Sequence, residues 1–169
     1  MSNFSWDAPT SMEDLLNSVL QIQQFPDKLT RILKLVNEQN RFNTYREGGW
    51  TITQIVHHLM DAHVNAYLRT KHILAQDTHE IQPWNENSWA EQLDSEFPIE
   101  SSVICLIGIH QRWSLLLLEA LKQPVVHLVK QLYHPENQRS ISLSDLIRLY
   151  AWHGEHHLAQ IELAIVNND

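Results

Sequence analysis

The sequence predicts an all-α fold in which four principal helices form a bundle. Apolar residues recur at the spacing of an amphipathic helix in four long stretches of the chain. The chain contains only 4 glycines, which indicates few tight turns, and no segment stands out with the two-residue alternation of a strand. A chain of 169 residues can bury a substantial core, so we expect a single domain over residues 1–169.

The first helix is predicted to begin at Ser11, a residue type common at helix N-caps, with the acidic Glu13 and Asp14 in its first turn. Helical spacing then resumes after Pro26 and continues to the polar run at residues 37–40. A proline in a helix interior removes a backbone hydrogen bond and bends or breaks the helix. The pattern therefore predicts either one long kinked helix or two helices in series.

The second helix follows a glycine pair at residues 48–49, can be capped by Thr51 or by Thr53, and extends to about Ala75. Its two adjacent histidines differ in direction. His57 points away from the apolar stripe, toward solvent or an interface, whereas His58 lies on the flank of that stripe.

A polar line runs down the second helix from His58 through Asn65 to Arg69, beside the core. Such a line can border a pocket. His63 lies nearer to the apolar centre of the helix, where it is either a competing metal ligand or a histidine of the core.

An irregular crossover is predicted between residues 76 and 98, with a short helix around Glu86–Leu93. It carries Trp84 and Trp89, which either pack on the bundle or contact a substrate. The third long helix is predicted from Ile99 to Lys122 and is nearly apolar on all sides, so we expect it to be the most buried. The single cysteine, Cys105, is expected to be a core thiol and not a nucleophile.

The last helix, capped by Ser142 or Ser144, carries His153 and His157 on one otherwise apolar side. The i, i+4 spacing lets both imidazoles reach a single ion, as in the HExxH helices of zinc enzymes. Glu155 is one position too late for the general base of that motif, so a peptidase is disfavoured. The pair is either a set of hydrogen-bonded core histidines or part of a metal site.

A metal site in a bundle is built from inward side chains on facing helices, so a third ligand is needed from elsewhere. The sequence lacks the Glu-x-x-His pairs of ferritin-type sites. The best candidate is His58, on a flank that borders a pocket. Three histidines with one open position are typical of catalytic centres, whereas closed structural sites have four protein ligands.

The composition excludes several classes of function. The formal net charge of −8 argues against a nucleic-acid-binding surface. The N-terminal residues lack a basic-then-apolar signal, and we find no apolar run near 18 residues that would span a bilayer, so we expect a cytoplasmic protein without a membrane segment.

Several motifs in a fixed order resemble the YfiT branch of the DinB-like superfamily of four-helix bundles. They cover about residues 12–165 and comprise residues 45–59 (YREGGWTITQIVHHL), Trp152-His153-x-x-x-His157, Tyr133-His134-Pro135, Asn65, Tyr67, Arg69 and Lys71. The resemblance implies an up-down-down-up bundle with a long crossover, a homodimer, and a divalent metal on three histidines. Carried over by position, these ligands are His58, the histidine before leucine in the His-His-Leu triplet, and the pair His153 and His157.

The resemblance also implies a metal-dependent hydrolase or a thiol S-transferase that joins bacillithiol to electrophiles. We expect an enzyme with one divalent ion per chain, Zn or Ni, that activates a thiol or water against a small electrophile. Asn65 and Arg69 are candidates for substrate binding, and no catalytic base is identified.

Thiol transfer is favoured over hydrolysis, because the strip below His58 offers no carboxylate to move protons and thiolate attack needs none. The alternative hypothesis is a non-catalytic bundle that binds metal or a small ligand in a stress response.

Overall fold

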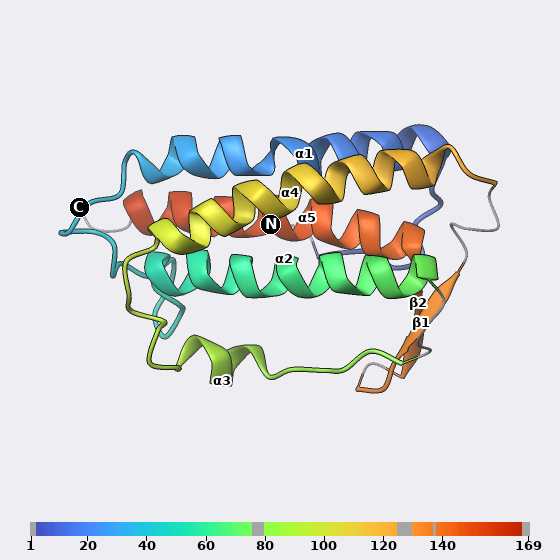
Figure 1. Ribbon diagram of the computed structural model, residues 1–169. Helices are drawn as coiled ribbons and strands as arrows, with labels where there is room; N and C mark the ends of the chain where they lie inside the picture. The colour runs from blue at the N-terminus through green and yellow to red at the C-terminus, as the bar shows by residue number, and fades with distance from the viewer. Residues whose placement is uncertain (1–2, 76–79, 125–129, 137, 167–169) are drawn as a thin grey trace.

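Four long helices and one short helix make up most of the computed structural model (Figure 1), which describes residues 3–75, 80–124, 130–136 and 138–166. The four-helix bundle predicted from the sequence is confirmed. The long helices are α1 (Met12–Leu33), α2 (Ile52–Ala75), α4 (Glu100–Leu121) and α5 (Leu143–Val166), and the short helix is α3 (Glu86–Ala90).

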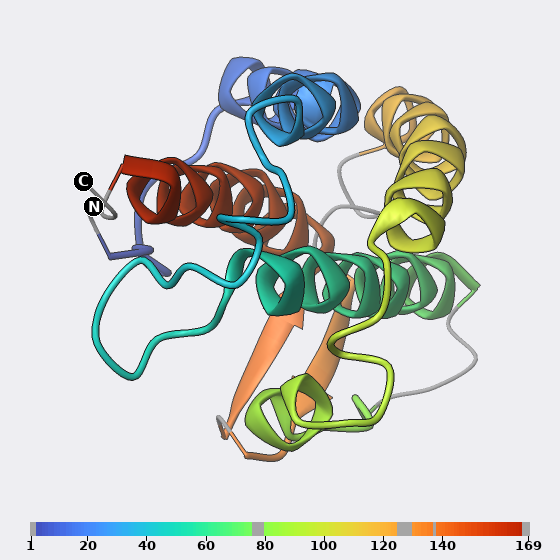
Figure 2. The same cartoon turned by 90° about the vertical axis from the view of Figure 1, so that its left-hand side faces the viewer.

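The helices follow an up-down-down-up course, with α1 and α5 running one way and α2 and α4 the other (Figure 1). Viewed along the bundle, α1 and α2 lie on one diagonal and α4 and α5 on the other (Figure 2). Each of α1 and α2 therefore packs against both α4 and α5. Helix α3 lies outside the bundle and packs on α2.

Helix α1 is one continuous helix, which decides between the two alternatives left open by Pro26. It begins at a capping box in which the backbone N–H of Asp14 donates to the Ser11 hydroxyl and the carboxylate of Asp14 accepts from the Ser11 backbone. Pro26 is buried inside the helix. Because proline has no N–H, the carbonyl of Ile22 loses its usual partner four residues on.

Helices α2 and α5 begin in the same way, whereas α4 has no side-chain cap. The Thr51 hydroxyl accepts from the backbone N–H of Gln54, whose side chain accepts from the Thr51 backbone in return. Ser142 and Asp145 form the equivalent pair at the start of α5. Thr53 has a different role, because its hydroxyl donates to the Arg41 carbonyl and holds the preceding loop.

A two-stranded antiparallel hairpin, β1 (Gln131–His134) and β2 (Arg139–Ser142), corrects the expectation that the chain has no strands. Each strand has only four residues, too few to show a clear alternation in the sequence. Leu132 and Ile141 pair across the hairpin and are both buried. The carbonyl of Tyr133 accepts from the N–H of Ile81, which ties the crossover to the hairpin.

Helix α4 is not the most buried helix, contrary to expectation. Its Ile104 and Leu115 side chains are 69% and 61% exposed, and Cys105 is an exposed free thiol and not a core residue. The reason is that, among the described elements, α4 packs chiefly on α1 and α2, whereas α2 is also covered by α3 and β1 and α5 by β2, so α4 keeps an apolar outer face. Sequence alone does not show which side of an all-apolar helix meets the core.

The apolar character of α4 also bears on the expectation that no segment could span a membrane. Among the described residues, α4 is the one helix long and apolar enough to do so by length and composition alone, with 33% of its apolar window buried inside the bundle. Core helices of water-soluble bundles pass the same test, so this feature is weak evidence for a membrane.

Two apolar clusters fill the bundle and meet near its middle. One surrounds Trp113 and includes Ala62 of α2 and Ala151 of α5, while the other includes Leu59 of α2 and Leu158 of α5. The histidines of α2 and α5 therefore lie at the boundary between the clusters. Their polar rings separate the two apolar clusters.

Candidate metal centre

Three histidines converge from two helices that are far apart in sequence. His58 comes from α2, and His153 and His157 come one turn apart from α5. Each offers one ring nitrogen, and these nitrogens all lie within 4.8 Å of one another. The Nε2 atoms of His58 and His153 are 3.2 Å apart. The side chains predicted as ligands are thus brought together, and among the described residues they form the one group of this kind.

Burial keeps these imidazoles neutral. It lowers the pKa of His58 to about 4 and that of His157 to about 3, where the neighbouring His58 adds to the effect. Burial and the neighbouring His157 and His63 rings also lower the pKa of His153 well below its ordinary value. At pH 7 each ring therefore has a nitrogen lone pair available, which is the form that binds a metal.

Contacts behind the rings leave the Nε2 atoms of the α5 pair free to face the centre. Nδ1 of His157 donates to the Gln160 side-chain oxygen at 2.7 Å, and Nδ1 of His153 contacts Nε2 of His63 at 3.1 Å. His58 Nδ1 is buried and has no partner among the described residues. Such outer partners fix ring orientation in metal sites.

The donor set fits a divalent transition metal. Two neutral Nε2 atoms at 3.2 Å gain a single hydrogen bond when metal-free, whereas an ion between them satisfies both lone pairs. Imidazole suits Zn, Ni, Cu and Fe, and no carboxylate belongs to the group. Three protein ligands leave a position open for another molecule.

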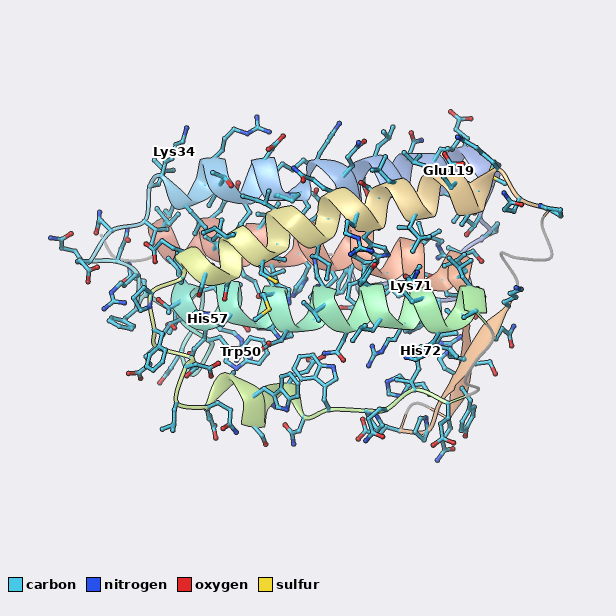
Figure 3. The ribbon with its side chains drawn as sticks, in the orientation of Figure 1. Lys34, Trp50, His57, Lys71, His72 and Glu119 are labelled. Atoms are coloured by element: carbon cyan, nitrogen blue, oxygen red, sulfur yellow. The ribbon has the colours of Figure 1, made fainter. Side chains whose placement is uncertain are left out.

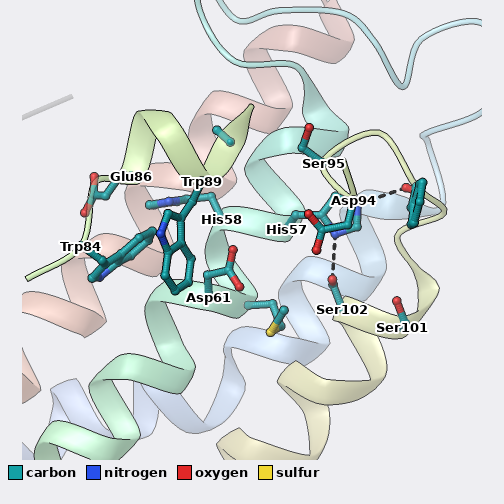
Figure 4. Close-up of a pocket in the computed structure, with 13 residues that line it drawn as sticks. His57, His58, Asp61, Trp84, Glu86, Trp89, Asp94, Ser95, Ser101 and Ser102 are labelled. Carbon is teal, nitrogen blue, oxygen red and sulfur yellow. Dashed lines mark hydrogen bonds between the residues drawn. The ribbon is translucent and has the colours of Figure 1, made fainter. Parts of the chain in front are cut away.

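His57 lies outside the centre, as the helical wheel predicted. Its two ring nitrogens contact the Ser102 hydroxyl at 2.8 Å and the Phe97 carbonyl at 3.0 Å, both marked by dashed lines in Figure 4. The ring is half-buried and joins α2 to the start of α4. It therefore occupies an interface within the chain.

Three indoles surround His58. The ring centroids of Trp50 and Trp84 are 4.6 and 5.8 Å from that of His58, and Trp89 lies 4.6 Å from Trp84. Trp50 comes from the loop before α2 and lies on the side of the bundle that α3 covers (Figure 3). Trp84 and Trp89 belong to the crossover, which thus covers the centre with apolar rings.

A cavity of about 120 Å³ adjoins the centre and has His58 in its wall (Figure 4). Three carboxylates and no Lys or Arg occur among the described residues that line it. These residues are His57, His58, Met60, Asp61, Trp84, Glu86, Trp89, Ala90, Asp94, Ser95, Phe97, Ser101 and Ser102. The cavity is therefore acidic and partly aromatic.

Asp61 is the carboxylate of this cavity that lies on the same helix as His58, one turn later. Burial, and then the negative charge of Asp94, raise the pKa of Asp61 to about 6, while His57 opposes the shift. A carboxyl group with this pKa can exchange a proton near neutral pH. Burial likewise raises the pKa of Glu86.

The polar residues predicted to bind substrate, Asn65 and Arg69, do not line this cavity. They line a second one of about 410 Å³, beside Leu132 of the hairpin. Arg69 Nη1 donates to the Tyr150 hydroxyl at 3.3 Å. Their role in binding a substrate stays a prediction.

Sequence reasoning missed Asp61, His110 and Gln160 as parts of the site. Asp61 lies off the line from His58 through Asn65 to Arg69, but it is three residues after His58, and i+3 positions also share a face. His110 is a lone histidine in the apolar stretch of α4, which is the signal that could have marked it. Gln160 comes three residues after His157 on α5, and this spacing is the signal that could have marked it as a neighbour of that ring.

Comparison with known proteins agrees with this geometry. Residues 21–161 match the DinB superfamily. The chain belongs to the DinB superfamily. Relatives in this superfamily include proteins of Bacillus cereus strain B4264 and Bacillus thuringiensis strain 97-27, each named a "putative metal-dependent hydrolase". Both are 36% identical over 161 residues, covering 95% of this chain and 91% of the relative.

Among solved structures, the DinB-type bundle is similar to YfiT from Bacillus subtilis, described as a probable metal-dependent hydrolase with an unusual four-helix bundle topology. That match has a TM-score of 0.89 and 32% identity, and covers 96% of this chain and 93% of YfiT. A mycothiol-dependent maleylpyruvate isomerase shares the fold, with a TM-score of 0.60 and 13% identity over 90% of this chain and 63% of its own.

Proposed function

We propose that this DinB-superfamily protein is a metal-dependent hydrolase of small molecules, with the metal held by His58, His153 and His157. The observation that carries the proposal is the convergence of these three neutral imidazoles beside a cavity that contains Asp61. The names of the relatives and of YfiT support the same reaction class.

The metal would act as a Lewis acid that brings the pKa of a water it holds to about 7 and would deprotonate a thiol outright. The chain supplies the remaining functions. Asp61, ionised above its pKa of about 6, takes a proton from the attacking water and returns it to the leaving group. Trp84 and Trp89 form an apolar part of the cavity wall.

The lining of the cavity limits the class of substrate. Asp61, Glu86 and Asp94 repel anions, and no described Lys or Arg of the lining offsets them. The paired indoles favour a flat or cationic group. A volume of about 120 Å³ holds only a small part of a molecule. We therefore expect a neutral or cationic ester or amide with a small group at the reacting end.

Thiol transfer was favoured from the sequence because no carboxylate was found near His58. Asp61 removes that reason, since it supplies the proton acceptor that hydrolysis needs. Bacillithiol-type transfer, and the non-catalytic bundle, remain the alternatives that the experiment must separate.

The test is to load the protein with Zn²⁺ or Ni²⁺ and assay matched neutral, cationic and anionic activated esters, without added thiol. Monochlorobimane with a panel of small thiols is assayed in parallel. We expect metal-dependent ester cleavage, weakest for the anionic ester and absent in His153→Ala. Conjugation that requires thiol and metal, without ester cleavage, would replace the hydrolase by a thiol transferase. Metal binding with neither activity would favour the non-catalytic bundle.

A homodimer and a cytoplasmic location also belong to the proposal. The exposed apolar face of α4, with Ile104, Ile107 and Leu115, is the surface we expect to pair with a second copy. A divalent ion in each chain and a small-molecule substrate complete the proposed assembly.

A further inference from the structure

A continuous line of hydrogen bonds leads away from the candidate metal centre and crosses all four long helices. Nδ1 of His153 on α5 contacts Nε2 of His63 on α2 at 3.1 Å. Nδ1 of His63 contacts Nε2 of His110 on α4 at 2.7 Å. Nδ1 of His110 contacts the carbonyl of Ile22 on α1 at 2.6 Å. His63 and His110 are each 1% exposed, so water does not compete for these bonds.

The last acceptor in this line is available because of Pro26. In an uninterrupted helix the carbonyl of Ile22 would accept from the N–H of residue 26, but proline has no N–H. An unpaired buried carbonyl is costly, and His110 supplies the missing donor. The proline within α1 therefore explains why a histidine of α4 points at α1.

The carbonyl also sets the direction of every bond in the line. It can only accept, so Nδ1 of His110 carries the proton. His110 is neutral, because burial lowers its pKa to about 4, and its Nε2 is therefore an acceptor. Nδ1 of His63 must then donate to it, which leaves Nε2 of His63 as the acceptor for His153.

We propose that His63 and His110 are positioning residues that hold His153 in the tautomer with its proton on Nδ1 and its lone pair on Nε2. That lone pair faces Nε2 of His58, at the place where the metal of the proposed function would lie. The line thus selects both the ring orientation and the free nitrogen of one ligand before any metal arrives. This inference rests on the proposed metal centre, but its first test does not need a metal.

The first experiment is ¹⁵N–¹H correlation of the histidine side chains in metal-free protein at pH 7.5. We expect His110, His63 and His153 to be protonated on Nδ1, with Nε2 unprotonated. Protonation of Nε2 on His63 or His153 would overturn the proposal. Because no metal is present, this result is independent of whether the protein is a hydrolase.

The second experiment measures Zn²⁺ affinity by competition with a chromophoric chelator. His63→Leu and His110→Leu remove the line, whereas His63→Gln and His110→Gln keep one donor and one acceptor about as far apart as the two ring nitrogens. We expect the leucine variants to bind Zn²⁺ about 10–100-fold more weakly. The glutamine variants should recover most of that loss. His57→Leu, a matched histidine of α2 outside the line, should keep the wild-type affinity.

Equal affinity in the wild type and the leucine variants would overturn the proposal, and so would equal losses in the leucine and glutamine variants, which would show that only packing matters. If the wild type binds no Zn²⁺, the proposed function fails while the ¹⁵N spectra still decide the tautomers. Circular dichroism of each variant shows whether it has folded.

Discussion

At the scale of single residues, the candidate site depends on burial more than on charge. His58 and His157 are 4% and 7% exposed, and the cost of placing a cation there keeps their rings neutral. Burial also favours the uncharged form of Asp61, and for a carboxyl group this raises the pKa instead of lowering it. One environment therefore prepares both metal ligands and a proton acceptor.

We predict that His58→Ala, His153→Ala and His157→Ala each abolish retention of the single divalent ion through gel filtration. Removal of one imidazole leaves two ligands, below the usual number for a catalytic centre. His57→Ala should retain its metal, because that ring bonds to Ser102 and Phe97. Elemental analysis is the measurement, and metal loss in His57→Ala alone would show that the ligand on α2 is misassigned.

We predict that Asp61→Asn lowers kcat/KM for ester cleavage by about 10²–10⁴-fold, the usual contribution of a general base. In the wild type, kcat/KM should rise with pH through about 6, because the carboxyl must lose its proton to act as a base. In Asp61→Asn, kcat/KM should lack this rise with pH (the acidic limb of the pH profile), while the variant retains its metal. Asp94→Asn, the matched control, should keep the limb and shift it to lower pH, since Asp94 raises the pKa of Asp61. A limb that persists in Asp61→Asn would rule out Asp61 as the base.

At the scale of helices, irregular positions inside α1 and α5 place the site. Pro26 frees the carbonyl that His110 uses. Gly154, between the two histidines of α5, lets the ring of Phe25 approach the helix backbone closely. That ring also stacks on His110, with centroids 5.1 Å apart. The helices are therefore packed around the histidines by residues that sequence patterns treat as interruptions.

We predict that Gly154→Ala destabilises the protein by about 1 kcal/mol. A Cβ at this position would lie 2.8 Å from Cδ2 of Phe25, and overpacking costs about 1–3 kcal/mol, partly offset by the better helix propensity of alanine, about 1 kcal/mol. Gly108→Ala on α4 is the control, because its Cβ would meet nothing within 4 Å and should stabilise by up to about 1 kcal/mol. Urea unfolding measures both, and an unchanged or higher stability of Gly154→Ala would contradict the packing argument.

At the scale of the whole molecule, the bundle buries an unusual number of titratable rings. The pKa values of five inward histidines are lowered, chiefly by burial, whereas each would titrate near 6.5 in the unfolded chain. These are His58, His63, His110, His153 and His157. The folded state must therefore accept protons less readily than the unfolded state in mildly acidic solution.

We predict that the metal-free protein loses stability as the pH falls from about 6.5 toward 4. In this window the unfolded chain binds more protons than the folded chain, so the free energy of unfolding decreases with decreasing pH. Asp61 and Glu86 oppose the trend, because their raised pKa values favour the folded state at low pH, but they are two groups against five. Urea midpoints at pH 7.5 and 5.0 test this, and equal midpoints would show that the rings are not held neutral by folding.

We predict that light scattering gives twice the chain mass for the wild type. Replacing the exposed Ile104 and Leu115 of α4 by aspartate should shift the protein to a monomer, because buried unpaired charges are costly at an apolar interface. Leu93→Asp is the matched control, since Leu93 is 91% exposed and lies outside α4. A monomeric wild type at micromolar concentration would refute the homodimer.

Much of the architecture follows from local patterns. The spacing of apolar residues and the few glycines predict all four long helices, and Ser11, Thr51 and Ser142 cap three of them with their own side chains. The i, i+4 pair His153 and His157 shares a face for the same local reason. His58 lies beside a cavity, on the flank of α2 that helical spacing indicates, since the flank of a helix is set by its own periodicity.

The tertiary structure decided what depends on contacts between distant segments. The spacing of apolar residues does not predict that α4 leaves a face exposed, because burial depends on which helices lie beside it. The sequence pattern also does not predict the contacts among His63, His110 and the Ile22 carbonyl, which come from three helices and meet only in the packed bundle. Asp61 acquired its raised pKa only from the surrounding fold. Local sequence sets which way a side chain points from its own helix, and only packing sets what it meets there.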